Sequence, residues 1–148
     1  MTKVNDSRTT AMGLWTDANH ILEATKLLAG ESKLTNVRYY LLGHGIEEGL
    51  KAFIRAKNGT LQCLKSIGHD LELVCDWANA CGLSNHYILT TKDKQALAML
   101  NLYYKSKELE YRANGFKQYP PEDLLIEFLK QLLASIKYIC FQSLKAKK

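Results

Sequence analysis

The sequence lacks the features that mark membrane-spanning, secreted and metal-stabilised proteins. It has two prolines in 148 residues, and its four cysteines include no C-x-x-C pair. Without closely spaced cysteine and histidine ligands, a structural zinc site is not expected, and nothing else in the sequence points to a metal or a cofactor. No apolar run approaches the roughly 20 residues that a membrane-spanning helix needs. We therefore expect reduced cysteines and no membrane segment.

The charge and the N-terminal segment restrict the possible locations and partners. The first 15 residues contain no apolar segment of the kind found in secretory signals. With no disulfide pattern either, we expect a cytoplasmic protein. The formal net charge is +5, but Lys145, Lys147 and Lys148 lie in the last four positions. Positive charge concentrated in a short tail does not by itself indicate a nucleic-acid-binding surface.

The length and composition predict one globular domain. Hydrophobic residues make up 47% of the chain and charged residues 24%, which is enough apolar material for one hydrophobic core. We expect a single domain over residues 1–148, with its core over about 10–144. No stretch alternates apolar and polar residues for long enough to predict a sheet, whereas helical spacing recurs along most of the chain. Apolar residues three and four apart predict helices over about 11–29, 36–57 and from 70 to about 80.

Two further helices have recognisable starts. Thr90 and Asp93 form a capping-box pattern, and we expect the helix that follows to carry Tyr111 and to end near 114–115. Prolines 120 and 121, followed by two acidic residues, begin the last helix. The sequence thus predicts an all-α fold, an antiparallel up-and-down bundle of about five helices.

The second predicted helix has two different faces. At about 100° per residue, one side is apolar and carries Tyr39, Leu42, Ile46, Leu50 and Phe53, flanked by Gly43 and Gly49, which would let another helix approach closely. The opposite side is mixed and carries Tyr40, His44, Glu47, Glu48, Lys51 and Arg55. The pairs His44/Glu48 and Glu47/Lys51 have the i,i+4 spacing of helical contacts. This mixed face fits a solvated surface, a helix–helix or dimer contact, or a ligand site.

Three segments, taken in order, resemble the HEPN domain family of helical bundles. Residues Tyr40–Ile54 are similar to the second-helix pattern of the family, a glutamate followed three and four residues later by Leu-Lys. Residues Gly68–Leu73 are similar to the Gly-His-Asp-Leu turn that opens its third helix. The third segment runs from Tyr103 to Tyr119 and resembles the tyrosine and Arg-Tyr-Pro region before its last helix.

This resemblance implies an up-and-down bundle that is usually dimeric and often encoded beside a minimal nucleotidyltransferase. Family members include ribonucleases, toxins and non-catalytic nucleotide-binding or scaffold proteins. The ribonucleases use an arginine followed four to six residues later by a histidine. The matching arginine is Arg112, but residues 113–119 contain no histidine. Without an imidazole, no group of near-neutral pKa is available there to move the 2′-hydroxyl proton.

The prediction is therefore a non-catalytic binding module for a nucleotide, a nucleic acid or a nucleotidyltransferase partner, and a divergent ribonuclease or toxin is the alternative. We assign no catalytic residue. Asp70 is a natural N-cap, and His69 in the turn before it could hydrogen-bond a neighbouring helix, a structural role that competes with a ligand role. The candidate ligand- or partner-binding residues are Tyr40, His44, Glu47, Lys51, His69, Asp70, Arg112 and Tyr119.

Overall fold

The computed structural model describes residues 9–106 and 118–145, and this part of the chain is helical with no strand. The helices are α1 (Ala11–Leu27), α2 (Thr35–Ala56), α3 (Leu61–Ile67), α4 (Leu71–Ala80), α5 (Thr91–Tyr104) and α6 (Glu122–Lys145), with short 3-10 helices η2 (Ser32–Leu34) and η3 (Leu83–Asn85). The predicted all-α bundle is confirmed. The expected extension of α5 through Tyr111 falls outside the described residues.

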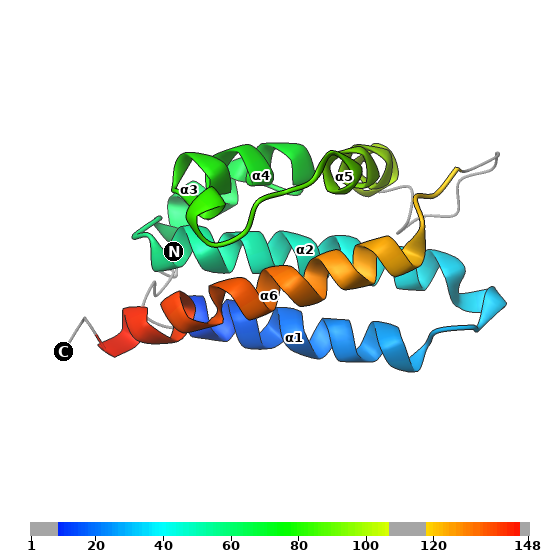
Figure 1. The fold of residues 1–148 in the computed structure, drawn as a ribbon, viewed down its shortest axis with the longest axis horizontal. Coiled ribbons are helices and arrows are strands. Elements are labelled where there is room, and N and C mark those ends of the chain that lie inside the picture. The colour runs from blue at the N-terminus through cyan, green and yellow to red at the C-terminus, as the bar shows by residue number, and fades with distance from the viewer. Residues whose placement is uncertain (1–8, 107–117, 146–148) are drawn as a thin grey trace, which may run out of the picture.

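Helix α2 lies at the centre of the bundle and contacts all the other α-helices (Figure 1). The long helices α1, α2 and α6 lie side by side, and the shorter α3, α4 and α5 cover α2 on the side away from α1. Helix α1 runs antiparallel to both of its long neighbours. Helices α2 and α6 run in the same direction, because α3–α5 carry the chain back to the start of α2. Arg38 near the start of α2 accordingly pairs with Glu122 at the start of α6.

Side-chain caps explain where the helices begin. The side chains of Thr10, Thr60, Asp70 and Thr90 each accept a hydrogen bond from a backbone N–H in the first turn of α1, α3, α4 and α5. At Thr90 the predicted capping box is complete, since the Asp93 carboxylate accepts from the Thr90 backbone N–H. Helix α3, which was not predicted, is only seven residues long, too short for its apolar spacing to stand out.

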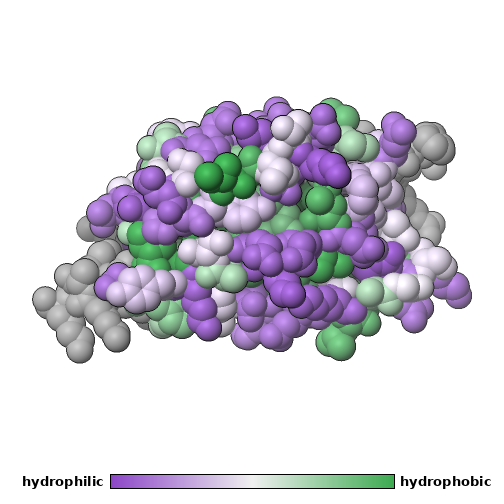
Figure 2. Space-filling model, viewed as in Figure 1, coloured by the Kyte–Doolittle hydropathy of each residue, from purple (hydrophilic) through white to green (hydrophobic). Residues whose placement is uncertain are grey.

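The predicted apolar stripes form the core. Tyr39, Leu42, Ile46, Leu50 and Phe53 of α2 are all buried, as are Leu125, Phe128, Leu129, Leu132, Ile136 and Cys140 of α6. The face of the molecule on which α6 lies is mainly hydrophilic, with separate small hydrophobic areas (Figure 2). Within the described ranges, no helix combines the length and apolar character that crossing a bilayer would require.

Candidate functional site

The carboxylate of Glu47 is the centre of a polar cluster inside the bundle. Glu47 lies in the middle of α2 and is 3% exposed. Its Oε1 accepts hydrogen bonds from the Tyr104 hydroxyl at 2.7 Å and from Nδ1 of His69 at 2.8 Å. Its Oε2 accepts from Nζ of Lys51 at 2.8 Å, and the same ammonium donates to the carbonyl of Gly68. Three parts of the chain are thus joined at one buried charge: α2, the turn between α3 and α4, and α5.

Glycine at position 43 makes room for this cluster. The Tyr104 ring lies so close to the α2 backbone that a Cβ at Gly43 would be 2.4 Å from Cδ1 of the ring. The hydroxyl of Tyr104 can therefore reach Glu47, one helical turn further along α2. The expected close approach at this glycine is confirmed, and the helix that approaches is α5.

The turn before α4 is held by a second set of polar contacts. The predicted N-cap role of Asp70 is confirmed, because its Oδ1 accepts from the backbone N–H of Leu73. The same oxygen accepts from Nδ2 of Asn101, while Oδ1 of Asn101 accepts from the backbone N–H of Leu71. Oδ2 of Asp70 pairs with Nζ of Lys105 at 3.2 Å. These contacts fix the position of the adjacent His69, whose side chain is 60% exposed.

Four rings lie in sequence along this side of the bundle, and we call them the ring strip: His44, Tyr40, Tyr104 and His69. Neighbouring centroids are 6.2 Å apart for His44 and Tyr40, 6.2 Å for Tyr40 and Tyr104, and 6.4 Å for Tyr104 and His69. These spacings are within the range of aromatic contacts. Tyr104 is buried and Tyr40 is half-buried, whereas the two imidazoles at the ends are more accessible.

The charges around the strip are set by its hydrogen bonds. Burial by itself raises the pKa of Glu47, but the hydrogen bonds from Lys51, His69 and Tyr104 outweigh it, and the pKa lies below the ordinary value. The hydrogen bond from His44 to the Glu48 carboxylate raises the pKa of His44, against an opposing effect of burial. Glu47 is therefore an anion at neutral pH, and His44 gains a proton more readily than a solvated imidazole.

The structure brings together five of the predicted site residues and separates another. Tyr40, His44 and His69 belong to the ring strip, and Glu47 and Lys51 lie beneath it. Asp70 lies next to His69 but is engaged as a helix cap. Tyr119 belongs to a different cluster near the start of α2: it stacks on Tyr39 with centroids 4.2 Å apart and packs edge-on against Tyr103. Arg112 lies outside the described residues.

Two residues important to the site were not among the predicted ones. Tyr104 lies in the third segment that resembles the HEPN family but was not a candidate site residue, and Asn101 was not noted. A signal for Asn101 existed, because it lies four residues after Leu97 in the apolar stripe of α5 and is only 4% exposed. A buried amide within an apolar stripe must find hydrogen-bond partners, and its partners here are on α4 and its cap.

Comparisons of the chain with protein-family models, curated proteins and solved structures give no significant match. The resemblance to the HEPN family therefore rests on the three sequence segments alone, and membership stays a prediction. Two of those segments, Tyr40–Ile54 and Gly68–Leu73, meet in the structure at the hydrogen bond between His69 and Glu47.

Proposed function

We propose that this chain is a HEPN-like binding module that holds a nucleotide, free or within a single-stranded nucleic acid, against the ring strip. The observation that supports it is the alignment of His44, Tyr40, Tyr104 and His69, drawn from three elements, with Tyr104 and His69 held by one buried carboxylate. Tyr104 is buried beneath the other three rings in this row, which reach the surface. Planar side chains at a surface suit the stacking of bases, which contributes about 1–3 kcal/mol per base.

The strip also offers positive charge at its edges for phosphate. The side chains of His69 and His44 are 60% and 34% exposed, so part of each imidazole reaches solvent. Lys105 is 63% exposed and lies beside Asp70, at a shallow depression that Glu72, Asn101, Leu102 and Ser106 also line. The Lys105 ammonium and imidazole N–H groups are hydrogen-bond donors that suit phosphate oxygens. The ligand class that combines a flat ring with a phosphate is the nucleotide.

Within this proposal Glu47 and Lys51 position the strip and do not contact the ligand. Glu47 is buried, and the ammonium of Lys51 is already bonded to the Glu47 carboxylate and the Gly68 carbonyl. Their role is to hold Tyr104 and His69 in fixed orientations, so that little side-chain entropy is lost when a ligand binds. The alternative function, RNA cleavage, would instead require Arg112 together with an imidazole.

The binding experiment uses a fluorescently labelled single-stranded RNA and a labelled adenine nucleotide, measured by fluorescence anisotropy in EDTA. Substituting His69→Ala is expected to weaken binding about tenfold, the loss of one stacking and phosphate contact. His20→Ala is the matched control, since His20 is an exposed histidine on α1, a helix that contributes no residue to the strip. Equal affinity of the wild type, His69→Ala and His20→Ala would exclude the ring strip as the binding surface.

The same preparations distinguish a binding module from a ribonuclease. A binding module leaves the labelled RNA intact after prolonged incubation in EDTA. Cleavage that is lost in both Arg112→Ala and His69→Ala, and kept in His20→Ala, would replace our proposal with the metal-independent ribonuclease that the resemblance also allows.

We further propose a cytoplasmic homodimer, with a nucleotidyltransferase as the alternative occupant of the ring strip. Because the strip is assigned to a nucleotide, the dimer contact should lie elsewhere. Light scattering should therefore give the mass of two chains for both the wild type and Tyr40→Glu. Tyr138→Glu on the exposed surface of α6 serves as the control for adding charge at a tyrosine. A shift of Tyr40→Glu alone to the monomer mass would place the strip in the subunit interface.

A further inference from the structure

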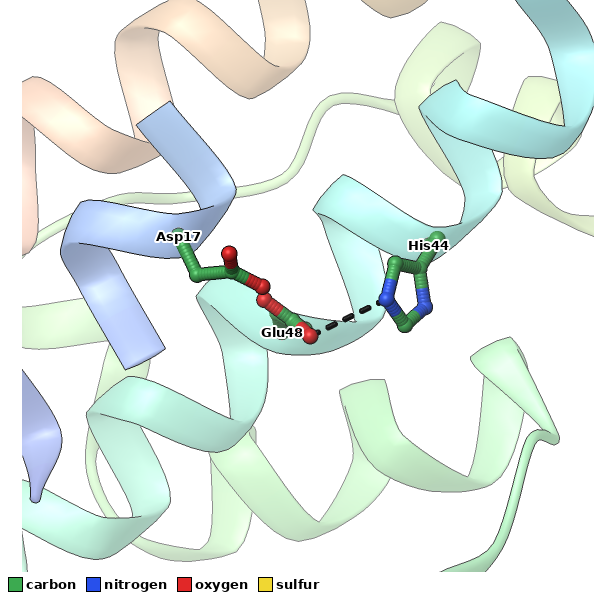
Figure 3. Close-up of side chains that lie close together, drawn as sticks. All are labelled: Asp17, His44 and Glu48. Atoms are coloured by element: carbon green, nitrogen blue, oxygen red, sulfur yellow. Dashed lines mark ion pairs between the residues drawn. The ribbon is translucent and has the colours of Figure 1, made fainter. Parts of the chain in front are cut away.

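A second cluster of polar groups lies between α1 and α2, apart from the Glu47 carboxylate. Asp17 of α1 faces Glu48 of α2, and His44 reaches the same carboxylate from one turn earlier in α2 (Figure 3). Nε2 of His44 is 3.0 Å from Oε1 of Glu48. One ligand atom from each of the three residues lies within 4.8 Å of the other two. Among the described residues, this is the one group of three or more such side chains close enough to share an ion.

One oxygen of Glu48 lacks a hydrogen-bond donor. Its Oε2 is buried, and among the side-chain nitrogens and oxygens of the described part of the chain it is the one buried atom without a partner. In Figure 3 the carboxylate of Asp17 lies directly beside the Glu48 carboxylate. Two carboxylates side by side repel each other unless a proton or a cation lies between them.

From this geometry we propose that Asp17, His44 and Glu48 form a binding site for a divalent transition-metal ion of the Zn²⁺ class. One imidazole nitrogen and two carboxylate oxygens are a donor set that such ions take, whereas Mg²⁺ prefers oxygen ligands alone. Zinc bonds of about 2.0–2.1 Å place neighbouring ligand atoms about 3.3 Å apart. In the structure the three ligand atoms lie within 4.8 Å of one another.

The site has a rigid half and an adjustable half. His44 and Glu48 are spaced i,i+4 on one helix, so their side chains project from the same face of α2. Asp17 is exposed on α1 and can turn toward the ion. Three protein ligands leave a fourth position for water or for an anionic group of a bound molecule. The proposed metal site shares His44 with the ring strip, whereas Asp17 and Glu48 lie outside it, so Asp17→Asn tests the metal site without altering the strip.

The test is calorimetric titration of metal-free protein with ZnCl₂, and separately with MgCl₂. The wild type is expected to bind one equivalent of Zn²⁺ and to bind Mg²⁺ far more weakly. Asp17→Asn should weaken Zn²⁺ binding by at least about tenfold, because even the loss of an outer-shell partner weakens metal sites by about 10–100-fold. Asp17 is exposed, so this variant should fold normally, which circular dichroism verifies.

His44→Gln should have the same effect on Zn²⁺ affinity. Asp76→Asn and His20→Gln are matched controls at exposed positions on α4 and α1, and both should bind Zn²⁺ as the wild type does. Three results would overturn the proposal: no saturable Zn²⁺ binding at millimolar concentration, equal affinity in the wild type and Asp17→Asn, or Mg²⁺ binding as tight as Zn²⁺ binding. Failure here leaves the RNA-binding experiment unaffected, because that experiment is done in EDTA.

Discussion

The ring of Tyr104 in α5 packs directly against Gly43 in α2, with no space for a side chain at position 43. That contact lets the tyrosine hydroxyl reach the buried carboxylate of Glu47. The carboxylate in turn holds His69 at the surface through a 2.8 Å hydrogen bond. One close approach between two helices therefore sets the position of an exposed imidazole from a third segment of the chain.

Replacing Gly43 with alanine should destabilise the protein even though alanine favours helices. The added Cβ would lie 2.4 Å from Cδ1 of Tyr104, so the ring must move and its hydrogen bond to Glu47 is lost. Overpacking of this kind costs about 1–3 kcal/mol of the free energy of unfolding, which urea denaturation measures. Gly49→Ala is the control, with a much smaller loss, because its Cβ would meet methyl groups of Leu133, Leu132 and Leu129, the nearest at 3.3 Å. Equal losses in the two variants would mean that the close contact between Gly43 and Tyr104 stabilises the fold no more than an ordinary core contact does.

The ion pair of Glu47 and Lys51 should show strong energetic coupling. Glu47→Gln leaves a largely buried ammonium without its anion, which should lower the free energy of unfolding by about 3 kcal/mol. Lys51→Met should cost less, because the Glu47 carboxylate keeps its bonds to His69 and Tyr104. The double variant should be less destabilised than the sum of the two, with a coupling of about 1–3 kcal/mol. Additive losses in urea denaturation would contradict a direct interaction.

The stability of the protein should fall in acid through Glu47. Its pKa is lower in the folded protein than the ordinary value of a glutamate carboxyl, so the folded state favours the ionised form. The stabilisation is present above the unfolded pKa and is lost as the pH falls through the lower, folded pKa. Urea denaturation between pH 6 and 3 should therefore show a decrease below about pH 4.5, and the decrease should be smaller in Glu47→Gln. An identical pH profile in that variant would assign the acid sensitivity to other carboxylates.

The four cysteines should divide into two reactive and two unreactive thiols. None of the four forms a disulfide, and Cys75 and Cys140 are buried whereas Cys63 and Cys81 are half-buried. Burial raises the pKa of Cys75 to about 11 and that of Cys140 to about 12, which removes the reactive thiolate at neutral pH. A thiol reagent that forms a coloured product should show two equivalents reacting quickly, and the rest only after denaturant is added. Four equivalents reacting at one rate would indicate a more open core.

The helices could be predicted from the sequence because they carry local signals. Thr90 and Asp93 mark the start of α5, and the apolar stripe of α6 is regular from Leu125 to Cys140. Helix α3 was missed because two turns give too few apolar repeats, although Thr60 caps it as the other caps do. The parallel course of α2 and α6 has no local signal, since it depends on how the intervening helices fold back.

The candidate site was only partly predictable, for a related reason. The pairs His44/Glu48 and Glu47/Lys51 follow from helical spacing, and both are present at 3.0 Å and 2.8 Å. The contribution of Tyr104 depends on α5 approaching α2, and that of Asp17 depends on α1 lying beside the same helix. Spacing along the sequence contains neither fact. The sequence distinguishes the mixed face of α2 from the apolar face. It does not show that Glu47 on the mixed face is buried, at 3% exposed.

The ring strip can be tested directly through the histidine side chains, because the chain has only four. Imidazole NMR spectra of isotope-labelled protein, titrated with a short single-stranded RNA, resolve each ring separately. If the strip binds the nucleotide, the signals of His44 and His69 should shift together to saturation, while those of His20 and His86 stay in place. Shifts confined to His20 and His86, or no shift at any histidine when the RNA is in large excess, would contradict a binding surface at the ring strip.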